Sequence, residues 1–496
     1  MVTIQGKVSA QLLRFPVQMN IVDSQGEQFQ TQTDRQGYYQ LSAAMMPPLV
    51  IEASEAVLDD EQCRGIRLCA FCEGGFGDLY DEWIIHLNPL TELLVSDMAV
   101  ALGFPGPVQL MKHFASCQHQ CSKLYRKTRA YFYQGFARAL AQVGLPEDFD
   151  PVHYDACWQP LFDQLVNIIW VNRNYDSASG QSGNTILTDL YFTPIAVPDV
   201  YGDVPVFDLE RLRQRKVRMD QADVRILLVG DSTASSYAPL VAPQTGWGQQ
   251  LEQWFDDSKV MVINAAKPGR SSRSYRHEGW FRYLKSLAKA GDYLLIQMGH
   301  NDEKADASLE GRGTYDVANL ATYPNTPQSV CQCPPEHPEL SFQYSLEFYL
   351  EQARQFELIP VLLTPTTRVL NAQGQMGFPV VHGHSTFQNA QKGYAFVGNY
   401  SQTVKDTATE NDVAVLDIES ATIDLVNRLG ESSWKDYWLA VDPVRYPHYL
   451  NRVGCWDLPD TTHFQIKGAY AVSELVANAI CHHPALSELS RMMKAS

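Results

Sequence analysis

Short runs in which apolar and polar residues alternate fill residues 1–87 of the chain. Turn-forming residues such as Gly26 and Gly37 separate the runs. Alternation with a period of two predicts strands with one buried face, and several short strands at close spacing predict a β-sandwich. We expect this module to act as a spacer or packing unit, with glycan binding as the alternative. The predicted strands are 3–8, 17–22, 29–33, 34–41 and 49–53.

Residues 88–223 change from this alternation to helical spacing and then to an irregular connector. Pro89 stands near the first turn of the first predicted helix, and apolar residues recur after it at helical intervals. Prolines beyond residue 176 predict an extended connector, and the charged run 210–218 predicts a solvated face. Further helices are predicted over 108–143 and 158–171.

Strand and helix patterns alternate through the last segment, 224–496. Short apolar runs bounded by turn residues predict buried strands, and helical patterns separate them. This alternation is typical of α/β domains, in which helices cover both faces of a parallel sheet. We therefore predict an α/β catalytic domain preceded by a sandwich and a helical region, divided as 1–87, 88–223 and 224–496. The predicted strands are 225–229, 259–263, 292–297, 359–364 and 413–417, and the predicted helices are 247–255, 278–290, 342–356, 399–410 and 466–481.

The first strand of this segment leads to a serine that could act as a nucleophile. The run 225–229 is followed by Gly230, Asp231 and Ser232, and the residues after Ser232 can begin a helix. A serine at the carboxyl end of a parallel strand lies where open α/β sheets bind ligands. A helix N-terminus behind it would offer N–H groups to a developing negative charge. Alone, this motif fits a simple helix cap as well.

Three further polar blocks favour a nucleophilic serine over a simple helix cap. Two of them follow the second and third predicted strands, and the last stands directly before the final helix. Because the carboxyl ends of parallel strands meet at one edge of a sheet, we expect the strand-end blocks to lie near Ser232. The blocks are Asn-Ala-Ala-Lys-Pro-Gly-Arg-Ser-Ser at 264–272, Gly-His-Asn-Asp at 299–302 and Asp-Thr-Thr-His at 460–463.

The residue types in these blocks fit acyl transfer. Ser232 would attack the acyl carbon, His463 would take its proton, and Asp460 would hold the other ring nitrogen. The oxyanion would be bound by the N–H groups of Ser232 and Gly269 and by the side-chain amide of Asn301. Glycine suits position 269 because the backbone there must come close to the substrate.

Taken together, the blocks resemble those of SGNH hydrolases, also called GDSL-type esterases. More narrowly, residues 224–485 resemble the rhamnogalacturonan acetylesterases and related pectin acetylesterases of carbohydrate esterase family 12. The motifs that carry the resemblance are Gly-Asp-Ser-Thr-Ala at 230–234, Gly-Trp-Gly at 246–248, Gly-Arg-Ser-Ser-Arg-Ser-Tyr at 269–275 with Glu-Gly at 278–279, Gly-His-Asn-Asp at 299–302, and Asp-Thr-Thr-His-Phe at 460–464.

The resemblance implies a three-layer, flavodoxin-like α/β fold, metal-independent deacetylation of pectic polysaccharide and an exported location. Carried over to this sequence, it implies that Ser232, Asp460 and His463 form a catalytic triad. Gly269 and Asn301 complete the implied oxyanion hole.

Substrate contacts are predicted for Arg270 and Trp247, and the cationic Arg270 favours a polar substrate. The insertion 303–340 and the segment 376–398 have no match in the family pattern, and we expect them to form rims of the cleft. The amino-terminal alternation resembles small carboxypeptidase-regulatory-like sandwiches, which contribute no catalytic residue.

Composition excludes several classes of partner. A formal net charge of -17 argues against nucleic acid or an anionic membrane surface. No stretch approaches the length of a membrane span, and the amino terminus lacks the features of a signal peptide. We expect a periplasmic or secreted protein whose signal was removed, with a cytoplasmic one possible. The ten cysteines show no clean zinc set, so we predict no metal or other cofactor, and both disulfides and free thiols remain open.

Two other functions fit parts of the pattern. A lipase or thioesterase of the same fold would act on another acyl ester, but few apolar residues surround the blocks. A glycan-binding protein with a relict site would not need the complete set of Ser232, Asp460 and His463. We therefore predict a carbohydrate O-acetylesterase with an acetylated polysaccharide or oligosaccharide as its substrate; the oligomeric state stays open.

Overall fold

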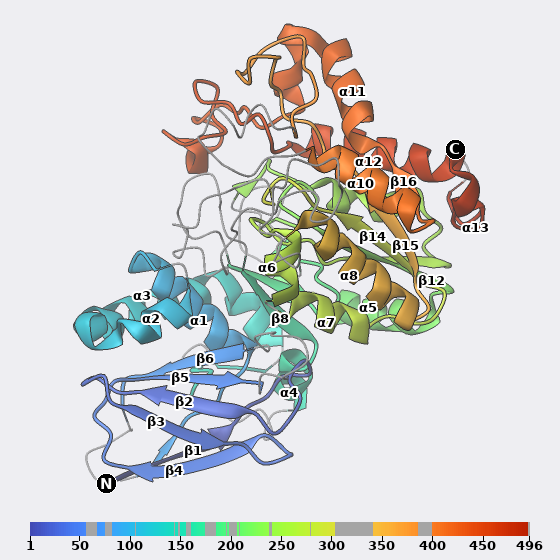
Figure 1. Ribbon diagram of the computed structural model, residues 1–496. Coiled ribbons are helices and arrows are strands. Elements are labelled where there is room, and N and C mark those ends of the chain that lie inside the picture. Colours follow the sequence, from blue (N-terminus) through green and yellow to red (C-terminus); the bar gives the residue numbers. More distant parts are fainter. Residues whose placement is uncertain are drawn as a thin grey trace.

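A parallel sheet organises the C-terminal half of the chain in this computed structural model (Figure 1). Its strand order is β13-β12-β14-β15-β16, and all neighbouring strands pair in parallel. This is the 2-1-3-4-5 order of flavodoxin-like folds. The strands confirm those expected from the apolar runs. They are β12 (Val224–Gly230), β13 (Val260–Asn264), β14 (Tyr293–Gln297), β15 (Ile359–Leu363) and β16 (Ala414–Leu416).

Alternate residues of these strands face two different layers of helices. Leu227 and Val229 join one core, whereas Ile226 and Leu228 join another. Because both faces are covered, the strands are continuously apolar, which is why they could be recognised in the sequence. The first layer contains α7 (Trp280–Ser286), α8 (Phe342–Gln355) and α10 (Tyr400–Glu410); the second contains η3 (Trp247–Trp254), α11 (Ile418–Ser433) and α12 (Ile466–His482).

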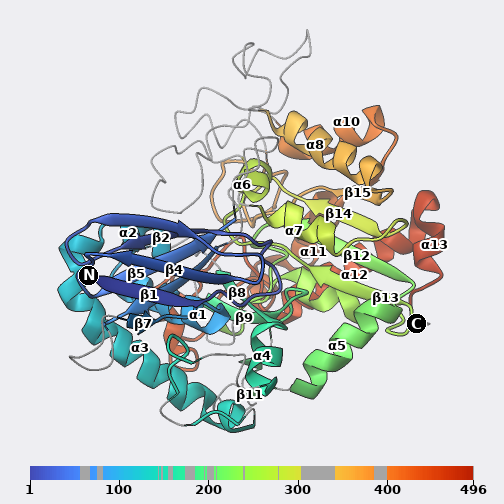
Figure 2. The ribbon, with the colours of Figure 1, turned by 90° about the horizontal axis from the view of Figure 1, so that it is seen from below.

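Two small sheets build the amino-terminal module. One has the order β4-β1-β7 and the other β3-β2-β5-β6, and Figure 2 shows them stacked beside the helical region. The strands β6 and β7 were not expected from the sequence. One of them, β6, is buried along almost its whole length because α1 covers it, so it shows no alternation. The strands are β1 (Val2–Lys7), β2 (Gln18–Val22), β3 (Gln28–Gln32), β4 (Tyr38–Ala43), β5 (Leu49–Ser54), β6 (Arg67–Cys72) and β7 (Glu82–Ile84).

The helical region follows the expected order with one correction. The predicted helix over 158–171 ends early, because residues 169–171 begin a strand that pairs with 185–189. Ile169, Trp170 and Val171 are buried there, and such β-branched and aromatic side chains favour a strand. The elements are α1 (Pro89–Ala101), α2 (Pro107–Lys112), α3 (Phe114–Gln142), α4 (Pro160–Val166), β8 (Ile169–Arg173), β9 (Thr185–Asp189), β10 (Ala196–Val197) and β11 (Val206–Phe207).

The charged run 210–218 lies on a helix, α5 (Leu209–Gln221), that the sequence pattern did not predict. Most of its charges are solvated, but Arg215 is buried. The Arg215 guanidinium donates to Asp189 at 2.8 Å and to Glu252 at 3.2 Å. Its buried ion pair with Asp189 lies within the connector, and its ion pair with the partly exposed Glu252 of η3 ties the connector to the catalytic domain.

Replacing Arg215 by alanine is expected to destabilise the protein by about 3 kcal/mol, because Asp189 would keep a buried charge without its cationic partner. Arg213 on the same helix provides the control, since its ion pair with Glu210 is exposed and an alanine there should cost less than about 1 kcal/mol. Denaturant unfolding of both variants would test this. Equal losses of stability in the two variants would mean that the buried ion pair contributes no more than the exposed one.

One hydrophobic core extends from the sandwich to the sheet. It joins side chains of the sandwich, such as Ile51, to Leu227 and Leu294 of the catalytic sheet. Lys267 adds a polar link: its ammonium lies 3.9 Å from the ring centroid of Trp280 and 4.5 Å from that of Phe192, which belongs to the connector. The domain boundaries at 87/88 and 223/224 stay predictions.

The structure describes residues 1–55, 67–74, 82–104, 106–142, 144–146, 149–154, 160–173, 185–194, 196–197, 206–207, 209–237, 241–277, 279–302, 341–384 and 399–494. The expected rim insertion 303–340 and most of 376–398 lie outside them. Within the described ranges, no helix combines the length and the apolar character that crossing a membrane requires. Among the described cysteines, Cys72, Cys117, Cys121, Cys455 and Cys481 are free thiols.

Candidate active site

The turn after β12 holds the candidate nucleophile. Ser232 is 5% exposed, and the preceding Asp231 is fully buried. The Asp231 carboxylate accepts hydrogen bonds from the N–H and the hydroxyl of Thr233, both at 2.9 Å. The expected helix start is wrong: residues 232–234 form a turn, closed by the Ala234 N–H donating to the Asp231 carbonyl. The turn is held by side-chain hydrogen bonds instead of a helix.

Asp460 and His463 form a hydrogen-bonded pair before α12. The Nδ1 of His463 lies 2.7 Å from Oδ2 of Asp460, and both residues are 7% exposed. The other carboxylate oxygen accepts the N–H groups of Thr462 at 2.8 Å and of His463 at 3.1 Å. Burial alone would raise the pKa of Asp460, but the charge and hydrogen bond of His463 and these N–H groups lower it to about 2. Asp460 can therefore hold a proton on Nδ1 and leave Nε2 as the acceptor.

A short segment ties the serine turn to the histidine turn. The Thr245 N–H donates to the Phe464 carbonyl at 3.0 Å, and the Trp247 N–H donates to the Thr233 carbonyl at 2.9 Å. Between them, Gly246 lies so close to the serine turn that a Cβ would stand 2.2 Å from the Ser235 carbonyl oxygen. The segment 245–247 is therefore hydrogen-bonded to Phe464, which follows His463, and to Thr233, which follows Ser232.

The other two predicted donors of the oxyanion hole, Gly269 and Asn301, come from adjacent loops. Lys267 donates its N–H to the Gly230 carbonyl at 2.9 Å, which places the loop after β13 beside the serine turn. Gly269 in this loop has a φ of 74°, a conformation that favours glycine. The Asn301 amide donates to the Arg270 carbonyl at 3.1 Å. The structure thus brings Asn301 next to the loop of Gly269, as the sequence predicted for the sheet edge.

The predicted substrate contact of Trp247 needs correction. Its side chain is fully buried in the core, and its indole N–H donates to the Gln297 side chain at 2.9 Å. A tryptophan with no exposed surface packs the domain and offers no face to a sugar. Arg270 is 8% exposed, and its guanidinium donates to the Pro268 carbonyl at 3.0 Å, so it folds back on its own loop. A substrate contact of Arg270 stays a prediction.

Asp302 was not singled out in the sequence, although it belongs to the same block as Asn301. Its Oδ1 accepts the N–H and the hydroxyl of Ser272 at 2.9 Å and 2.6 Å, which links the turn after β14 to the start of α6 (Ser272–His277). Its Oδ2 is buried and has no hydrogen-bond partner among the described residues. Burial, together with the nearby charge of Asp231, raises the pKa of Asp302 to about 7.

This shift predicts a pH dependence of stability. A carboxyl that is protonated in the folded protein but ionised in the unfolded chain makes folding less favourable as pH rises from about 4 to about 7. Asp302→Asn keeps the acceptor for Ser272 and cannot ionise. We expect the variant to lose less stability than the wild type across that range, by a few kcal/mol at about 1.4 kcal/mol per pKa unit. Parallel stability curves would contradict the assignment.

No group of three or more His, Cys, Asp or Glu side chains suited to a metal ion occurs among the residues that the structure describes. The chemistry available in these loops is that of a hydroxyl, an imidazole–carboxylate pair and N–H donors. This set resembles the components of serine acyl transfer.

Comparison with known proteins gives the family. The profile of the GDSL-like lipase/acylhydrolase family matches residues 228–454, so Asp460 and His463 lie beyond it. The chain is 30% identical to the rhamnogalacturonan acetylesterase RhgT of Bacillus subtilis over 262 residues, which cover 53% of this chain and 91% of RhgT. A rhamnogalacturonan acetylesterase of Emericella nidulans is 40% identical over 87 residues, 18% of this chain and 32% of that protein.

Solved structures are more distant. The structure of YXIM from Bacillus subtilis is 21% identical, covers 52% of this chain and 56% of its own, and superposes with a TM-score of 0.34. The assignment rests on the sequence relatives. A relative that is 30% identical and matched over nine-tenths of its length shares its family with this chain. The chain belongs to the GDSL-like lipase/acylhydrolase family, the SGNH hydrolases, and is a serine carboxylic ester hydrolase.

Proposed function

We propose that the chain is a carbohydrate O-acetylesterase that removes acetyl groups from pectin, rhamnogalacturonan or their oligosaccharides. The observation that carries this proposal is the buried pair of His463 and Asp460, 2.7 Å apart, joined through the segment at Thr245 and Trp247 to the turn of Ser232. The names of the relatives RhgT and the Emericella enzyme support the substrate class.

The proposed reaction proceeds through an acetyl-enzyme. Ser232 Oγ attacks the acetyl carbon while His463 Nε2 takes its proton. The oxyanion is bound by the N–H groups of Ser232 and Gly269 and by the Asn301 amide. When the intermediate collapses, His463 gives the proton to the departing sugar oxygen. Water then attacks the acetyl-serine, with His463 again as base, and releases acetate and the free serine hydroxyl.

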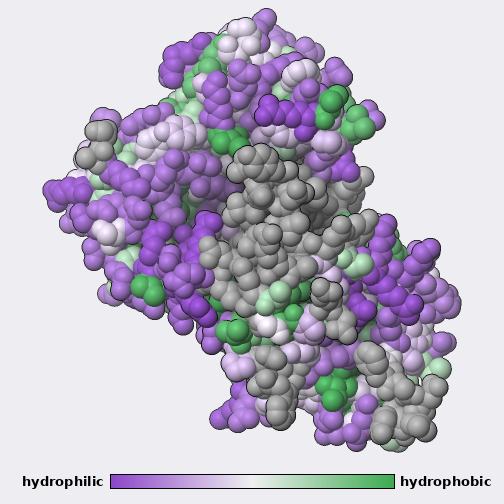
Figure 3. Space-filling model, turned by 180° about the vertical axis from the view of Figure 1, so that it is seen from behind, coloured by the Kyte–Doolittle hydropathy of each residue, from purple (hydrophilic) through white to green (hydrophobic). Residues whose placement is uncertain are grey.

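One face of the molecule and the net charge of the chain bear on the kind of substrate. On the face seen in Figure 3, hydrophilic residues dominate, and hydrophobic ones occur in small separate groups. The net charge of -17 does not favour an anionic lipid surface. Within the family, the acidic net charge favours a sugar ester over an ester held in an anionic lipid surface. A periplasmic or secreted location would suit such a polymer and stays a prediction.

The test is acetate release from acetylated rhamnogalacturonan, acetylated pectin and acetylated xylan side by side, with tributyrin and an acyl thioester as competing substrates. Ser232→Ala measured on each provides the background. We expect the highest kcat/KM on one of the two pectic substrates. A preference for xylan would move the proposal to another glycan, and a preference for tributyrin or the thioester would contradict it.

A further inference from the structure

A buried histidine links the turn of Ser232 to the turn of Asn301. His300 is 2% exposed, and its Nδ1 lies 2.9 Å from Oδ2 of Asp231, which directly precedes Ser232. Its Nε2 lies 2.9 Å from the carbonyl oxygen of Thr366, beyond β15. We propose that His300 is a positioning residue that acts through Asp231 to fix Ser232 relative to Asn301. This inference rests on the catalytic roles proposed above for these two residues.

Burial, together with the charges of the nearby His384 and Arg368, lowers the pKa of His300 despite its contact with Asp231. The positions of the two acceptors nevertheless indicate an ion pair of His300 and Asp231. A carbonyl such as that of Thr366 can only accept, and an ionised Asp231 can only accept, so the His300 ring must donate from both nitrogens. Burial raises the pKa of Asp231, but the charge of His300 and the hydrogen bonds from His300 and Thr233 outweigh burial and lower it to about 2. An imidazolium between two fixed acceptors forms two short, directional hydrogen bonds, which together define the position and the orientation of its ring.

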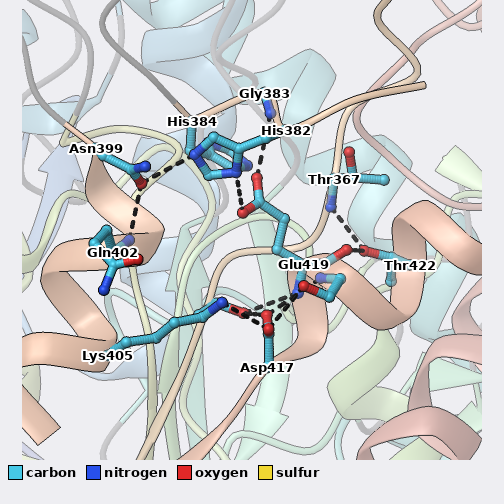
Figure 4. A network of polar contacts seen from close by, with 12 residues as sticks. Thr367, His382, Gly383, His384, Asn399, Gln402, Lys405, Asp417, Glu419 and Thr422 are labelled. Atoms are coloured by element: carbon cyan, nitrogen blue, oxygen red, sulfur yellow. Dashed lines mark hydrogen bonds and ion pairs between the residues drawn. The ribbon is translucent and has the colours of Figure 1, made fainter. Parts of the chain in front are cut away.

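The second acceptor is itself held by a buried cluster. The Thr366 carbonyl lies 2.9 Å from Nε2 of His384, and the rings of His384 and His300 meet edge to face with centroids 4.5 Å apart. Figure 4 shows the adjacent His382 turned toward Glu419 of α11, and their closest atoms are 2.5 Å apart. Because Thr366 and His384 hold the His300 ring in place, it cannot easily follow a displaced serine turn.

Position matters here because each end of the link is one residue from a proposed catalytic group. Asp231 adjoins Ser232, and His300 adjoins Asn301. A displacement of about 1 Å between reacting groups can reduce turnover about 10²-fold. The sequence hides this role, because a histidine between Gly299 and Asn301 carries no pattern that distinguishes a structural from a positioning side chain.

Two substitutions of His300 separate its two contacts. An asparagine amide stands near the place of Nδ1 and can still donate to Asp231, whereas a glutamine amide stands near that of Nε2 and can donate only to Thr366. Both side chains are uncharged. We expect His300→Gln to lower kcat on an aryl acetate about 10²-fold, with KM changed less than about 3-fold. His300→Asn should lose about 10-fold or less.

Further variants keep the test decisive if His300→Gln folds poorly. Asp231→Asn combined with His300→Gln removes the unpaired buried carboxylate and should restore the fold. Its kcat should stay as low as that of His300→Gln, because Asp231 acts through the lost contact. His482→Gln is the control: this exposed histidine lies at the far end of α12, with its Nδ1 2.7 Å from the Asn478 carbonyl oxygen, and the variant should keep kcat within about 2-fold.

Equal kcat in folded His300→Gln and His300→Asn, or wild-type kcat in the double variant, would overturn the inference. Ser232→Ala, assayed in parallel, separates this outcome from a failure of the proposed function. Activity in that variant would refute the catalytic role of Ser232 and the inference with it. An inactive Ser232→Ala beside a fully active His300→Gln would refute only the positioning role.

Discussion

Replacing Ser232 by alanine is expected to lower kcat on an aryl acetate by about four to six orders of magnitude, because the acyl group would lose its acceptor. The fold should survive the change. The Tyr237 hydroxyl donates to the main-chain carbonyl of Ser232 at 2.6 Å, and alanine retains that carbonyl. Initial rates and circular dichroism on the same preparation would measure activity and folding together.

The matched control is Ser236→Ala, just beyond the same turn. The Ser236 hydroxyl accepts a hydrogen bond from Asn264 at 3.2 Å, so its loss should cost about 1 kcal/mol of stability and little turnover. Labelling with a fluorophosphonate adds a direct readout, since only an activated serine reacts quickly. A folded Ser232→Ala variant with wild-type turnover or full labelling would remove this residue from the mechanism.

Asp460→Asn is expected to reduce kcat about 10⁴-fold while leaving the geometry intact. The asparagine oxygen can still accept the N–H groups of Thr462 and His463, as Oδ1 does now. Its NH₂ group would instead donate to Nδ1 of His463. The ring proton then moves to Nε2, and this nitrogen can no longer take a proton from Ser232.

Asp436→Asn provides the control for this second substitution. Asp436 is 70% exposed and lies 4.0 Å from Lys467, so its neutralisation should change neither turnover nor stability measurably. A loss below about 10-fold in Asp460→Asn would indicate that the carboxylate does not set the proton position. Stability gives a second check: the lowered pKa of Asp460 means that its contribution is present above about pH 4 and is lost as pH falls toward 2.

The sheet and the site motifs were predictable because they combine strong local signals. The run 225–229 is apolar at nearly every position, as a strand covered on both faces must be, and it leads directly to Ser232. The spacing of Asp460 and His463 lets the two side chains meet across a single turn. Both signals lie within a few residues, so they can be recognised in the sequence without knowledge of tertiary contacts.

The rest depended on contacts between distant segments. Whether a tryptophan packs or faces a ligand depends on what covers it, and Trp247 is covered by the core around Gln297. The strand β6 lost its alternation because α1 lies on its outer face. The charged run of α5 concealed Arg215, whose partner Asp189 is 26 residues away. None of these arrangements has a local signature.

The core shared by the sandwich and the catalytic sheet has a consequence for unfolding. Two modules with separate cores melt independently, whereas modules that share buried side chains melt as one cooperative unit. Because side chains around Ile51 and Leu227 belong to one core, and Phe192 of the connector packs on Lys267, we expect a single calorimetric transition whose van't Hoff and calorimetric enthalpies agree. A destabilising substitution in the sandwich would then lower the temperature at which esterase activity disappears, although no atom of the sandwich is proposed to touch the substrate.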